Sequence, residues 1–243
     1  MTDVVRVAMW SGPRNISTAM MRAFENRPDA EVVDEPLYAA YLARTGLDHP
    51  VRDEVIASQP TDLATAVAGL SAPLRPGRRV HYAKHMAHHV DRDMDLGWTL
   101  GLRNVLLTRD PAEVVASYVR AREACEPEDL GVLQQGWLLE LWDEHGLEVP
   151  ILDAGEFLRA PEAHLRWLCA WLQIPFTDRM LSWPAGPRAS DGVWAPHWYA
   201  AVWSSTGFAP WRPREISLSA HEAAVAEACR PVYAALHARR VRV

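Results

Sequence analysis

The stretch at residues 6–24, RVAMWSGPRNISTAMMRAF, contains an apolar run, a short turn and a helix that opens on hydroxyl side chains. The turn holds Gly12 and Arg14, and the hydroxyls belong to Ser17 and Thr18. The first N–H groups of a helix have no partner within the helix and carry the positive end of its dipole, so they attract anions. The stretch therefore predicts a strand, an anion-binding loop and a helix; the alternative is a capped helix with Arg14 in solvent.

This loop differs from the Gly-x-x-x-x-Gly-Lys-Ser/Thr loop that binds ATP or GTP. Arginine stands in place of the lysine, the glycine before it is absent, and the spacing differs. The chain also lacks a clear apolar strand ending in an aspartate that would hold magnesium. These departures argue against a nucleoside triphosphatase.

Short apolar runs that end in polar or turn-forming residues predict the strands, and helical patterns separate them. The predicted strands cover residues 4–10, 30–36, 78–85, 103–111 and 149–155. The predicted helices cover residues 17–26, 37–44, 51–58, 61–70, 111–122, 128–145, 161–172 and 220–238. Because this alternation builds a mostly parallel sheet covered on both faces, we expect a three-layer, P-loop-like α/β fold with about five strands. Ligands bind such sheets at the carboxyl ends of the strands.

The length of 243 residues suits one large α/β domain, and we treat residues 1–243 as a single domain. A net charge of −6 and a pI near 5.9 argue against nucleic acid as the main partner, because DNA-binding domains usually carry a strongly basic face. The net charge does not describe any single cleft, so a negative total charge is compatible with a local basic pocket for a small anion.

The cysteines Cys125, Cys169 and Cys229 are far apart in sequence, which predicts neither a disulfide framework nor a metal knuckle. Cys169 lies in the apolar helical stretch LRWLCAWL and is expected to be a small buried side chain. The N-terminus lacks the pattern of a secretory signal, and no apolar run approaches about 20 residues. We therefore expect a cytoplasmic protein without a membrane span, and the sequence leaves the oligomeric state open.

The fourth predicted strand and the helix after it read LLTRDPAEVVASYVR. Arg109 stands at the carboxyl end of the strand, and Ser117 follows eight residues later on the helix. An arginine and a hydroxyl placed in this way can hold one phosphate through charge-assisted hydrogen bonds. The alternative is that Arg109 pairs with Asp110 or Glu113 and that Ser117 only packs.

The pairing of SGPRNIST after the first strand with RDPAEVVAS after a later one resembles the sulfotransferase family, which uses 3′-phosphoadenosine 5′-phosphosulfate as its sulfonate donor. The resemblance implies that Arg109 and Ser117 bind the 3′-phosphate and that the first loop binds the 5′-phosphosulfate, with no metal. The loop residues implied in donor binding are Arg14, Asn15, Ile16, Ser17 and Thr18. An arginine at the first of these positions is similar to carbohydrate and tyrosylprotein members, whereas cytosolic phenol-type members have lysine.

The resemblance covers residues 4–183, with strict motifs at two places, and is that of a divergent bacterial-type member. The segments VVDEPLY and FLRAPEAHLRWLCAWLQIPF extend it beyond the two loops. Ile16 occupies a position where the family usually has glycine. Because a β-branched residue disfavours positive φ, the loop must follow a different backbone path or tolerate strain. The family's C-terminal RKG element is also absent.

Sulfonate transfer requires in-line placement of donor and acceptor, neutralisation of developing charge, and a base for an acceptor hydroxyl. Arg14 and the helix N-terminus would stabilise the leaving 5′-phosphate and the sulfonyl oxygens. Glu35, at the end of the second predicted strand, is the predicted base, and glutamate bases in several non-cytosolic members support it. The alternatives for Glu35 are a surface carboxylate or an ion-pair partner of Arg14. Asp34 is expected on the opposite face, because side chains alternate along a strand.

The third predicted strand ends in YAKHMAHH, again at the functional edge of the sheet. Lys84 would bind bridging or sulfonyl oxygens, and His85 is the alternative base, as a histidine is in cytosolic members. His88 and His89 resemble a metal-binding tract, but no carboxylate stands at ligand spacing, so no metal site is predicted. The alternative for the whole group is a polar loop after a strand.

A Trp-rich segment at residues 183–213 stands out among the 11 tryptophans of the chain. Five of them fall within it: Trp183, Trp194, Trp198, Trp203 and Trp211. Flat apolar rings often form core, but they also form walls for aromatic, sugar or lipid ligands, so we expect a lid and acceptor pocket.

The sequence as a whole predicts an enzyme that moves a sulfonate group from 3′-phosphoadenosine 5′-phosphosulfate to a hydroxyl or amine of a small-molecule acceptor. One alternative is a P-loop-type nucleotide kinase or phosphotransferase. Another is a protein that keeps the sulfotransferase fold but uses its anion site without catalysis or for different chemistry. The sequence leaves the identity of the acceptor open.

Overall fold

A computed structural model describes residues 4–120, 125–213 and 215–243. Its centre is a five-stranded sheet with the order β2-β3-β1-β4-β5, in which every paired strand is parallel. The strands are β1 (Val5–Ser11), β2 (Ala30–Asp34), β3 (Val80–Met86), β4 (Arg103–Thr108) and β5 (Ile151–Asp153). Because β1 lies between β3 and β4, the loop that follows it emerges among the ends of its neighbours.

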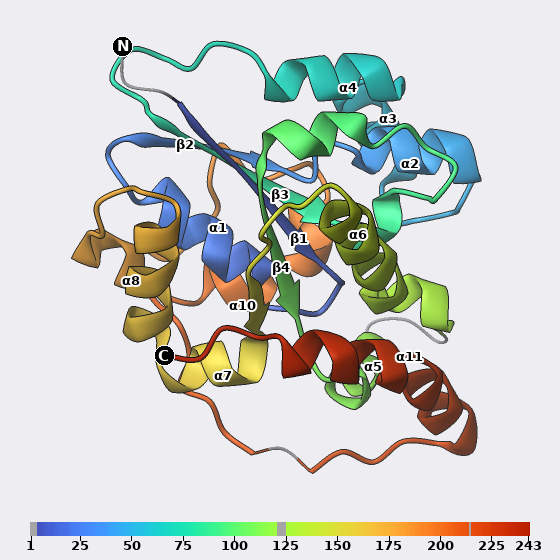
Figure 1. Ribbon diagram of the computed structural model, residues 1–243. Coiled ribbons are helices and arrows are strands. Elements are labelled where there is room, and N and C mark those ends of the chain that lie inside the picture. The colour runs from blue at the N-terminus through green and yellow to red at the C-terminus, as the bar shows by residue number, and fades with distance from the viewer. Residues whose placement is uncertain (1–3, 121–124, 214) are drawn as a thin grey trace.

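Helices cover both faces of the sheet, and Figure 1 shows α1 and α8 on one side and α6 and α11 on the other. The α-helices are α1 (Ser17–Glu25), α2 (Tyr38–Thr45), α3 (Arg52–Ser58), α4 (Leu63–Leu70), α5 (Pro111–Tyr118), α6 (Val132–Glu144), α7 (Ala154–Arg159), α8 (Pro161–Trp171), α9 (Ala195–Trp198), α10 (Ala200–Trp203) and α11 (Ala220–Ala238). The short 3-10 helices are η1 (Ala87–His89), η2 (Gly97–Gly101), η3 (Pro127–Leu130) and η4 (Asp178–Leu181). The expected three-layer α/β fold is confirmed.

The alternation of side chains along β1 produces two separate cores. Val7 and Met9 pack with residues of α1 and α8, whereas Ala8 and Trp10 pack with residues of α6 and α11. Each face of a central parallel strand must be buried, which explains why β1 is apolar almost throughout. A third cluster joins α2 and α3 to Trp194 and Tyr199 of the Trp-rich segment.

Helices α9 and α10 were not predicted, and the helix predictions fail in three further places. The helix expected at residues 128–145 is divided at Gly131, whose φ of 73° ends η3 before α6 begins. Helix α7 was missed, because the strand predicted through residue 155 ends at Asp153, which caps α7 by accepting from the backbone N–H of Glu156. The helix expected to run from residue 111 through residue 122 ends at Tyr118, and residues 121–124 lie outside the described part of the chain.

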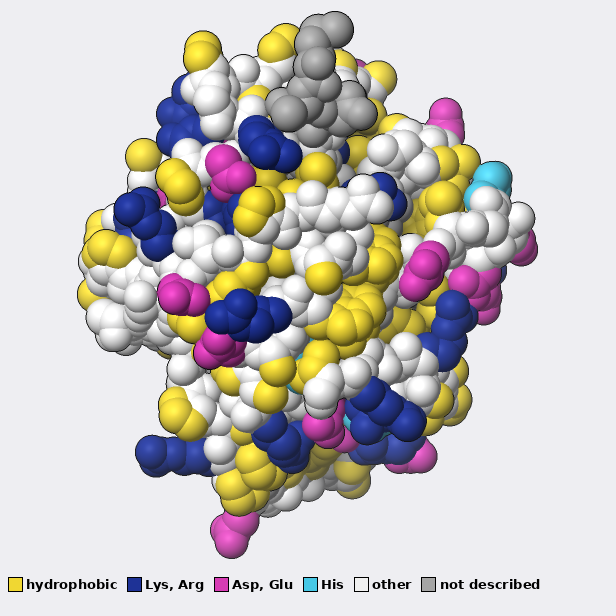
Figure 2. Space-filling view, turned by 60° about the vertical axis from the view of Figure 1, so that its left-hand side comes forward, with side chains coloured by type: hydrophobic (Ala, Val, Ile, Leu, Met, Phe, Trp, Pro, Cys, Tyr) yellow, Lys and Arg dark blue, Asp and Glu magenta, His cyan; other side chains and the backbone are white. Residues whose placement is uncertain are grey.

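The surface carries charges of both signs, and Figure 2 shows basic and acidic side chains interspersed on one face with hydrophobic side chains between them. Within residues 4–120, 125–213 and 215–243, no helix is both long and apolar enough to cross a membrane. The buried position of Cys169, predicted from its apolar surroundings, is confirmed.

Candidate active site

The loop at residues 12–16 connects β1 to α1 and forms the first wall of the site. Ile16 has a φ of −89°, whereas the left-handed conformation falls on Arg14, with a φ of 54°. Of the two outcomes expected for a β-branched residue here, the loop follows a different backbone path, because its positive φ falls two residues earlier. The side chain of Asn15 fixes this path by donating to the carbonyl of Leu107 at 2.9 Å and accepting from the N–H of Ile16 at 2.8 Å.

Gly12 allows the loop to lie against η3. A Cβ atom at this position would be 2.0 Å from the carbonyl oxygen of Leu130, which is a backbone atom and cannot swing away. We expect Gly12→Ala to lower the free energy of unfolding by about 1–3 kcal/mol in urea denaturation. Gly69→Ala is the matched control, because a Cβ there meets no atom within 4 Å and alanine is expected to stabilise helix α4 by about 0.5–1 kcal/mol. Equal stability of the two variants would contradict the close contact at Gly12.

The N-terminus of α1 points its uncapped end at the site. Ile16 occupies the N-cap position without a side-chain hydrogen bond, and Ser17 and Thr18 line the adjoining cavity. A helix start that is not capped by its own chain leaves N–H groups for a ligand, and its dipole favours an anion.

The Arg109–Ser117 element meets this loop directly. Nε of Arg14 donates to Oγ of Ser117 at 3.1 Å, and Nη1 of Arg109 donates to the carbonyl of Arg14 at 2.6 Å. The alternative partner foreseen for Arg109 is also present, because its guanidinium pairs with Glu113 at 2.8 Å. Burial, and then the charge of Arg109, lower the pKa of Arg14. Two guanidinium groups and one carboxylate meet here, so this corner has a net positive charge that an anion would balance.

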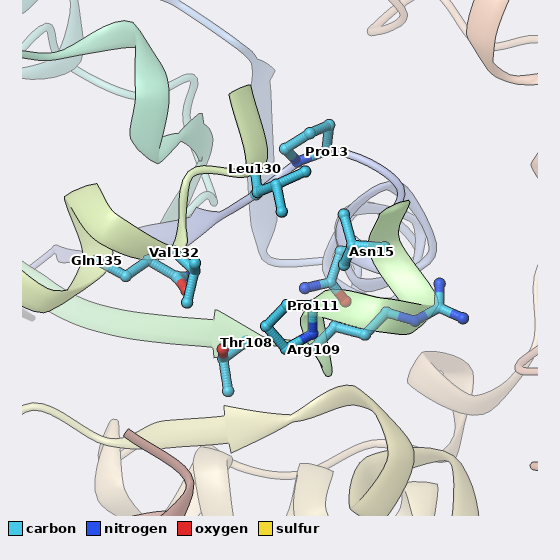
Figure 3. A pocket seen from close by; sticks show the side chains of 10 residues that line it. Pro13, Asn15, Thr108, Arg109, Pro111, Leu130, Val132 and Gln135 are labelled. Atoms are coloured by element: carbon cyan, nitrogen blue, oxygen red, sulfur yellow. The ribbon is translucent and has the colours of Figure 1, made fainter. Parts of the chain in front are cut away.

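Figure 3 shows the small pocket behind the loop, lined by side chains that include Asn15, Thr108, Arg109 and Gln135. Nε2 of Gln135 donates to the carbonyls of Trp10 at 3.0 Å and Leu107 at 2.9 Å. These carbonyls lie near the ends of β1 and β4, so Gln135 ties α6 to the base of the anion loop. Sequence reasoning missed this residue, although a glutamine on a largely apolar helix was a usable signal.

The second wall of the site is a buried ionic cluster. Nζ of Lys84 lies 2.8 Å from Oδ1 of Asp34 and 2.7 Å from Oε1 of Glu35. The prediction that Asp34 and Glu35 point to opposite faces is wrong. Strand β2 ends at Asp34, and Glu35 adopts a φ of 42°, which turns its side chain back toward the same ammonium group.

The members of this cluster shift one another's proton affinity. Burial raises the pKa of Glu35; the positive charge of Lys84 opposes this rise and the negative charge of Asp34 adds to it. Burial alone would lower the pKa of Lys84, but Asp34 and Glu35 hold it well above its ordinary value. Glu35 is therefore a carboxylate of increased basicity beside a permanently charged lysine, which suits a proton acceptor.

The histidines at the end of β3 and in η1 occupy different environments. The ring of His85 stacks on Trp10 with centroids 4.3 Å apart, on the face of the sheet away from Lys84, and burial lowers its pKa to about 3. His89 stacks between Tyr38 and Tyr41, with centroids 4.9 and 4.7 Å away. His85 is not brought to Glu35 or to the cavity, so the geometry favours Glu35 over His85 as the base. In the described part of the chain, no cluster of three or more His, Cys, Asp or Glu side chains could hold a metal ion.

One cavity of about 970 Å³ joins the two walls. Arg14, Arg109 and Ser117 line it together with Glu35 and Lys84. The Trp-rich segment supplies a further wall that includes Trp198, Tyr199, Val202, Phe208 and Trp211. Other tryptophans of the segment are core, because Trp183 and Trp194 are buried.

The sulfotransferase-domain family model matches residues 5–240. The chain belongs to the sulfotransferase family. Its fold is similar to the sulfotransferase domain of the curacin biosynthetic pathway, with a TM-score of 0.59 and 15% identity over 95% of this chain and 99% of that one. It is also similar to the sulfotransferase domain of the Synechococcus PCC 7002 olefin synthase, with a TM-score of 0.54 and 14% identity over 94% and 95% of the two chains.

The curated relatives that the chain matches are longer proteins. The chain is 36% identical over 233 residues to branched-chain-amino-acid aminotransferase-like protein 2 of Arabidopsis thaliana, a match that covers 92% of this chain and 40% of that protein. It is also 36% identical over 218 residues to the plant's aminotransferase-like protein 1, with 88% and 38% covered. The chain thus spans about two fifths of the length of these relatives.

Tyr199 is a residue of the candidate site that no pattern in the sequence indicates. Its hydroxyl accepts from Nζ of Lys84 at 2.5 Å and from Nε1 of Trp194 at 3.2 Å, and donates to Oδ2 of Asp34 at 2.6 Å. The sequence predicts the surrounding tryptophans as pocket walls, whereas the tyrosine among them contacts the ionic cluster.

Proposed function

We propose that the protein transfers a sulfonate group from 3′-phosphoadenosine 5′-phosphosulfate to a hydroxyl or amine of a small-molecule acceptor. The observation that supports this best is the arrangement within one cavity. Arg14 and Ser117, 103 residues apart, are in hydrogen-bond contact at one part of its wall, and the basic carboxylate of Glu35 lies at another. A donor with two separated phosphate groups and an acceptor that must lose a proton require these two features together.

The donor would be held by the residues of the first wall. Arg109 and Ser117 would bind the 3′-phosphate, and Arg14 with the N–H groups of α1 would bind the 5′-phosphosulfate. Asn15, Ile16, Ser17 and Thr18 would complete this loop, as the sequence predicts. The side chains of Leu158, Phe208 and Trp211 line the same cavity and offer apolar surfaces suited to a nucleobase.

The acceptor would lie against Glu35. This carboxylate would take the proton of the attacking group while Arg14 and the start of α1 stabilise the charge that develops on the leaving phosphate. Lys84 would keep Glu35 in place, because its ammonium group contacts Asp34, Glu35 and Tyr199 at 2.5–2.8 Å. Proton removal, charge stabilisation and in-line placement would then come from this chain's own side chains.

The donor assignment predicts a specific response to removal of the 3′-phosphate. Wild-type protein should bind 3′,5′-bisphosphoadenosine more tightly than adenosine 5′-phosphate in calorimetric titrations. In Arg109→Ala this preference should shrink by roughly 10–150-fold, because a charge-assisted hydrogen bond contributes about 1.5–3 kcal/mol. The ratio of the two affinities is the decisive quantity, since Arg109 also supports the loop through the carbonyl of Arg14.

Arg103→Ala is the matched control for this experiment. Arg103 begins the same strand at its opposite end, where its guanidinium lies 5.7 Å from the ring centroid of Trp171. Its replacement should leave the preference unchanged. Folded wild-type protein that does not bind 3′,5′-bisphosphoadenosine would refute the proposed donor, and magnesium-dependent binding of ATP instead would favour a nucleotide phosphotransferase.

A further inference from the structure

Two adjacent carboxylates share one lysine, but their surroundings differ. Asp34 is surrounded by donors: Oδ1 accepts from Lys84 at 2.8 Å, and Oδ2 accepts from the hydroxyl of Tyr199 at 2.6 Å and the N–H of Gly192 at 3.3 Å. These three hydrogen bonds fix the position of the Asp34 side chain. Asp34 is 4% exposed and is not among the residues that line the cavity, so it is placed as a fixed counter-charge.

Glu35 is held by fewer partners and lies at the cavity. Its Oε1 accepts from Lys84 at 2.7 Å, while Oε2 lies 3.9 Å from Nε2 of His89, beyond hydrogen-bond distance. Burial holds the pKa of His89 well below its ordinary value, so this ring is neutral and adds no second positive charge. The two neighbouring carboxyl groups thus have different environments, which is the condition under which one keeps its charge and the other exchanges a proton.

Tyr199 connects the pair of carboxylates, Asp34 and Glu35, to the Trp-rich segment. The tyrosine lies between α9 and α10, and its hydroxyl is buried against Lys84 and Asp34. Trp194 of the same segment donates to that hydroxyl, and Gly192 donates its backbone N–H to Asp34. Three groups of one segment therefore complete a cluster whose other members lie on β2, directly after β2 and on β3, more than 100 residues earlier in the chain.

We propose that Asp34 and Tyr199 are positioning residues that make Glu35 the proton acceptor of the site. Together with Lys84 they form a fixed ionic network that holds the Glu35 carboxylate at the cavity. The network is complete only when the Trp-rich segment packs against β2 and β3. The same packing therefore covers the acceptor and positions the base. The role of Glu35 in turnover rests on the proposed function, whereas the network itself can be tested without any substrate.

The groups that can influence the proton affinity of Glu35 come from every element around it. They are Asp34 on β2, Lys84 on β3, His88 and His89 on η1, Tyr199 in the Trp-rich segment, and Tyr38 and His49, which hydrogen-bond to each other at 2.8 Å beside α2. The largest effects of charge come from Lys84, which lowers the pKa of Glu35, and Asp34, which raises it. The hydroxyl of Tyr199 also lowers it.

Because these groups shift the pKa of Glu35 in opposite directions, two conservative substitutions should shift that pKa in opposite directions. Asp34→Asn removes a neighbouring negative charge and should lower the pKa of Glu35. Tyr199→Phe removes the hydroxyl that holds the Lys84 ammonium group beside the two carboxylates. Because Lys84 lowers the pKa of Glu35, loosening this group should raise that pKa. The measurement is a pH titration of the Glu35 side-chain carboxyl carbon by ¹³C NMR in glutamate-labelled protein, with the signal assigned by its loss in Glu35→Gln.

Tyr233→Phe is the matched control, because it removes a comparable bond, from the Tyr233 hydroxyl to Oδ2 of Asp153 at 3.0 Å, far along the chain from the cluster. It should leave the Glu35 titration unchanged. Hydrogen exchange in residues 194–203 should accelerate in Tyr199→Phe and remain as in wild type in Tyr233→Phe. The exchange measurement tests the seating of the segment independently of the titration.

Shifts of the same sign in Asp34→Asn and Tyr199→Phe, or no shift in either, would overturn the proposal. If Asp34→Asn does not fold, the test rests on Tyr199→Phe. An unchanged pKa of Glu35 together with unchanged hydrogen exchange in residues 194–203 would then refute the proposal. Binding of 3′,5′-bisphosphoadenosine is measured on the same samples. Its absence in wild type would count against the proposed donor but would leave the titration result standing, so the two failures are distinguishable.

Discussion

Glu35→Gln is expected to slow sulfonate transfer by roughly 10²–10⁴-fold, the usual contribution of a general base. Glutamine has the same shape and can still accept a hydrogen bond from Lys84, but it cannot take the proton of an acceptor. Donor-product binding should therefore persist while turnover falls. The measurement is single-turnover conversion of the donor to 3′,5′-bisphosphoadenosine, with the same acceptor alcohol or amine present for both proteins.

Glu31→Gln is the matched control for this loss. Glu31 belongs to the same strand but pairs with the exposed Arg75 at the surface, at 2.7 Å. Its replacement should leave the transfer rate unchanged. In wild type, transfer should fall as the pH drops through the pKa of Glu35, because the base must be ionised, and this acidic limb should lie above the ordinary value of 4.5 because that pKa is raised. Full activity of Glu35→Gln would place the base elsewhere.

Arg14→Ala is expected to lower the transfer rate by roughly 10²–10³-fold, the range measured when a group that stabilises developing charge is removed. The variant loses the guanidinium that lies between the start of α1 and Ser117. Alanine and arginine would both have to adopt the positive φ at this position. The comparison therefore measures the effect of the side chain with the backbone conformation unchanged. The rate is measured in the same single-turnover assay, and affinity for 3′,5′-bisphosphoadenosine is measured by calorimetry.

Arg14→Lys provides the graded comparison, since it keeps the charge and loses the planar fork of donors. Its rate should fall between those of wild type and Arg14→Ala. Unchanged turnover in Arg14→Ala on the true acceptor would mean that the loop serves a different purpose, such as anion binding without catalysis. That result would leave the family membership intact, because membership rests on the match over residues 5–240.

Local patterns were sufficient for the sheet and for the first wall of the site. An apolar run followed by a turn and a hydroxyl-bearing helix start is decided by neighbours in sequence, so β1, the loop and α1 were predicted within a residue or two. Arg109 and Ser117 are eight residues apart around one helix start, and their convergence on Arg14 follows from the parallel pairing of β1 and β4. The sequence expresses the periodicity of each element, whereas the pairing of β1 with β4 comes from the structure.

The second wall required the tertiary structure. Alternation along β2 wrongly separated Asp34 from Glu35, because the strand ends between them and the left-handed φ of Glu35 redirects its side chain. Nothing in the residues beside Tyr199 indicates that its hydroxyl will reach Asp34, 165 residues earlier. Gln135 likewise reaches Trp10 across 125 residues.

The sequence by itself determined the order of strands and helices along the chain, the loop at residues 12–16 and the positions of Arg109 and Ser117 around one helix start, because these depend on interactions between residues close along the chain. Only the tertiary structure decided that Glu35, rather than His85, faces the cavity, and that Asp34, Lys84 and Tyr199 surround it. The physical reason is that the hydrogen bonds and charges of this cluster join three distant segments, and their geometry is fixed only when the sheet and the Trp-rich segment pack together.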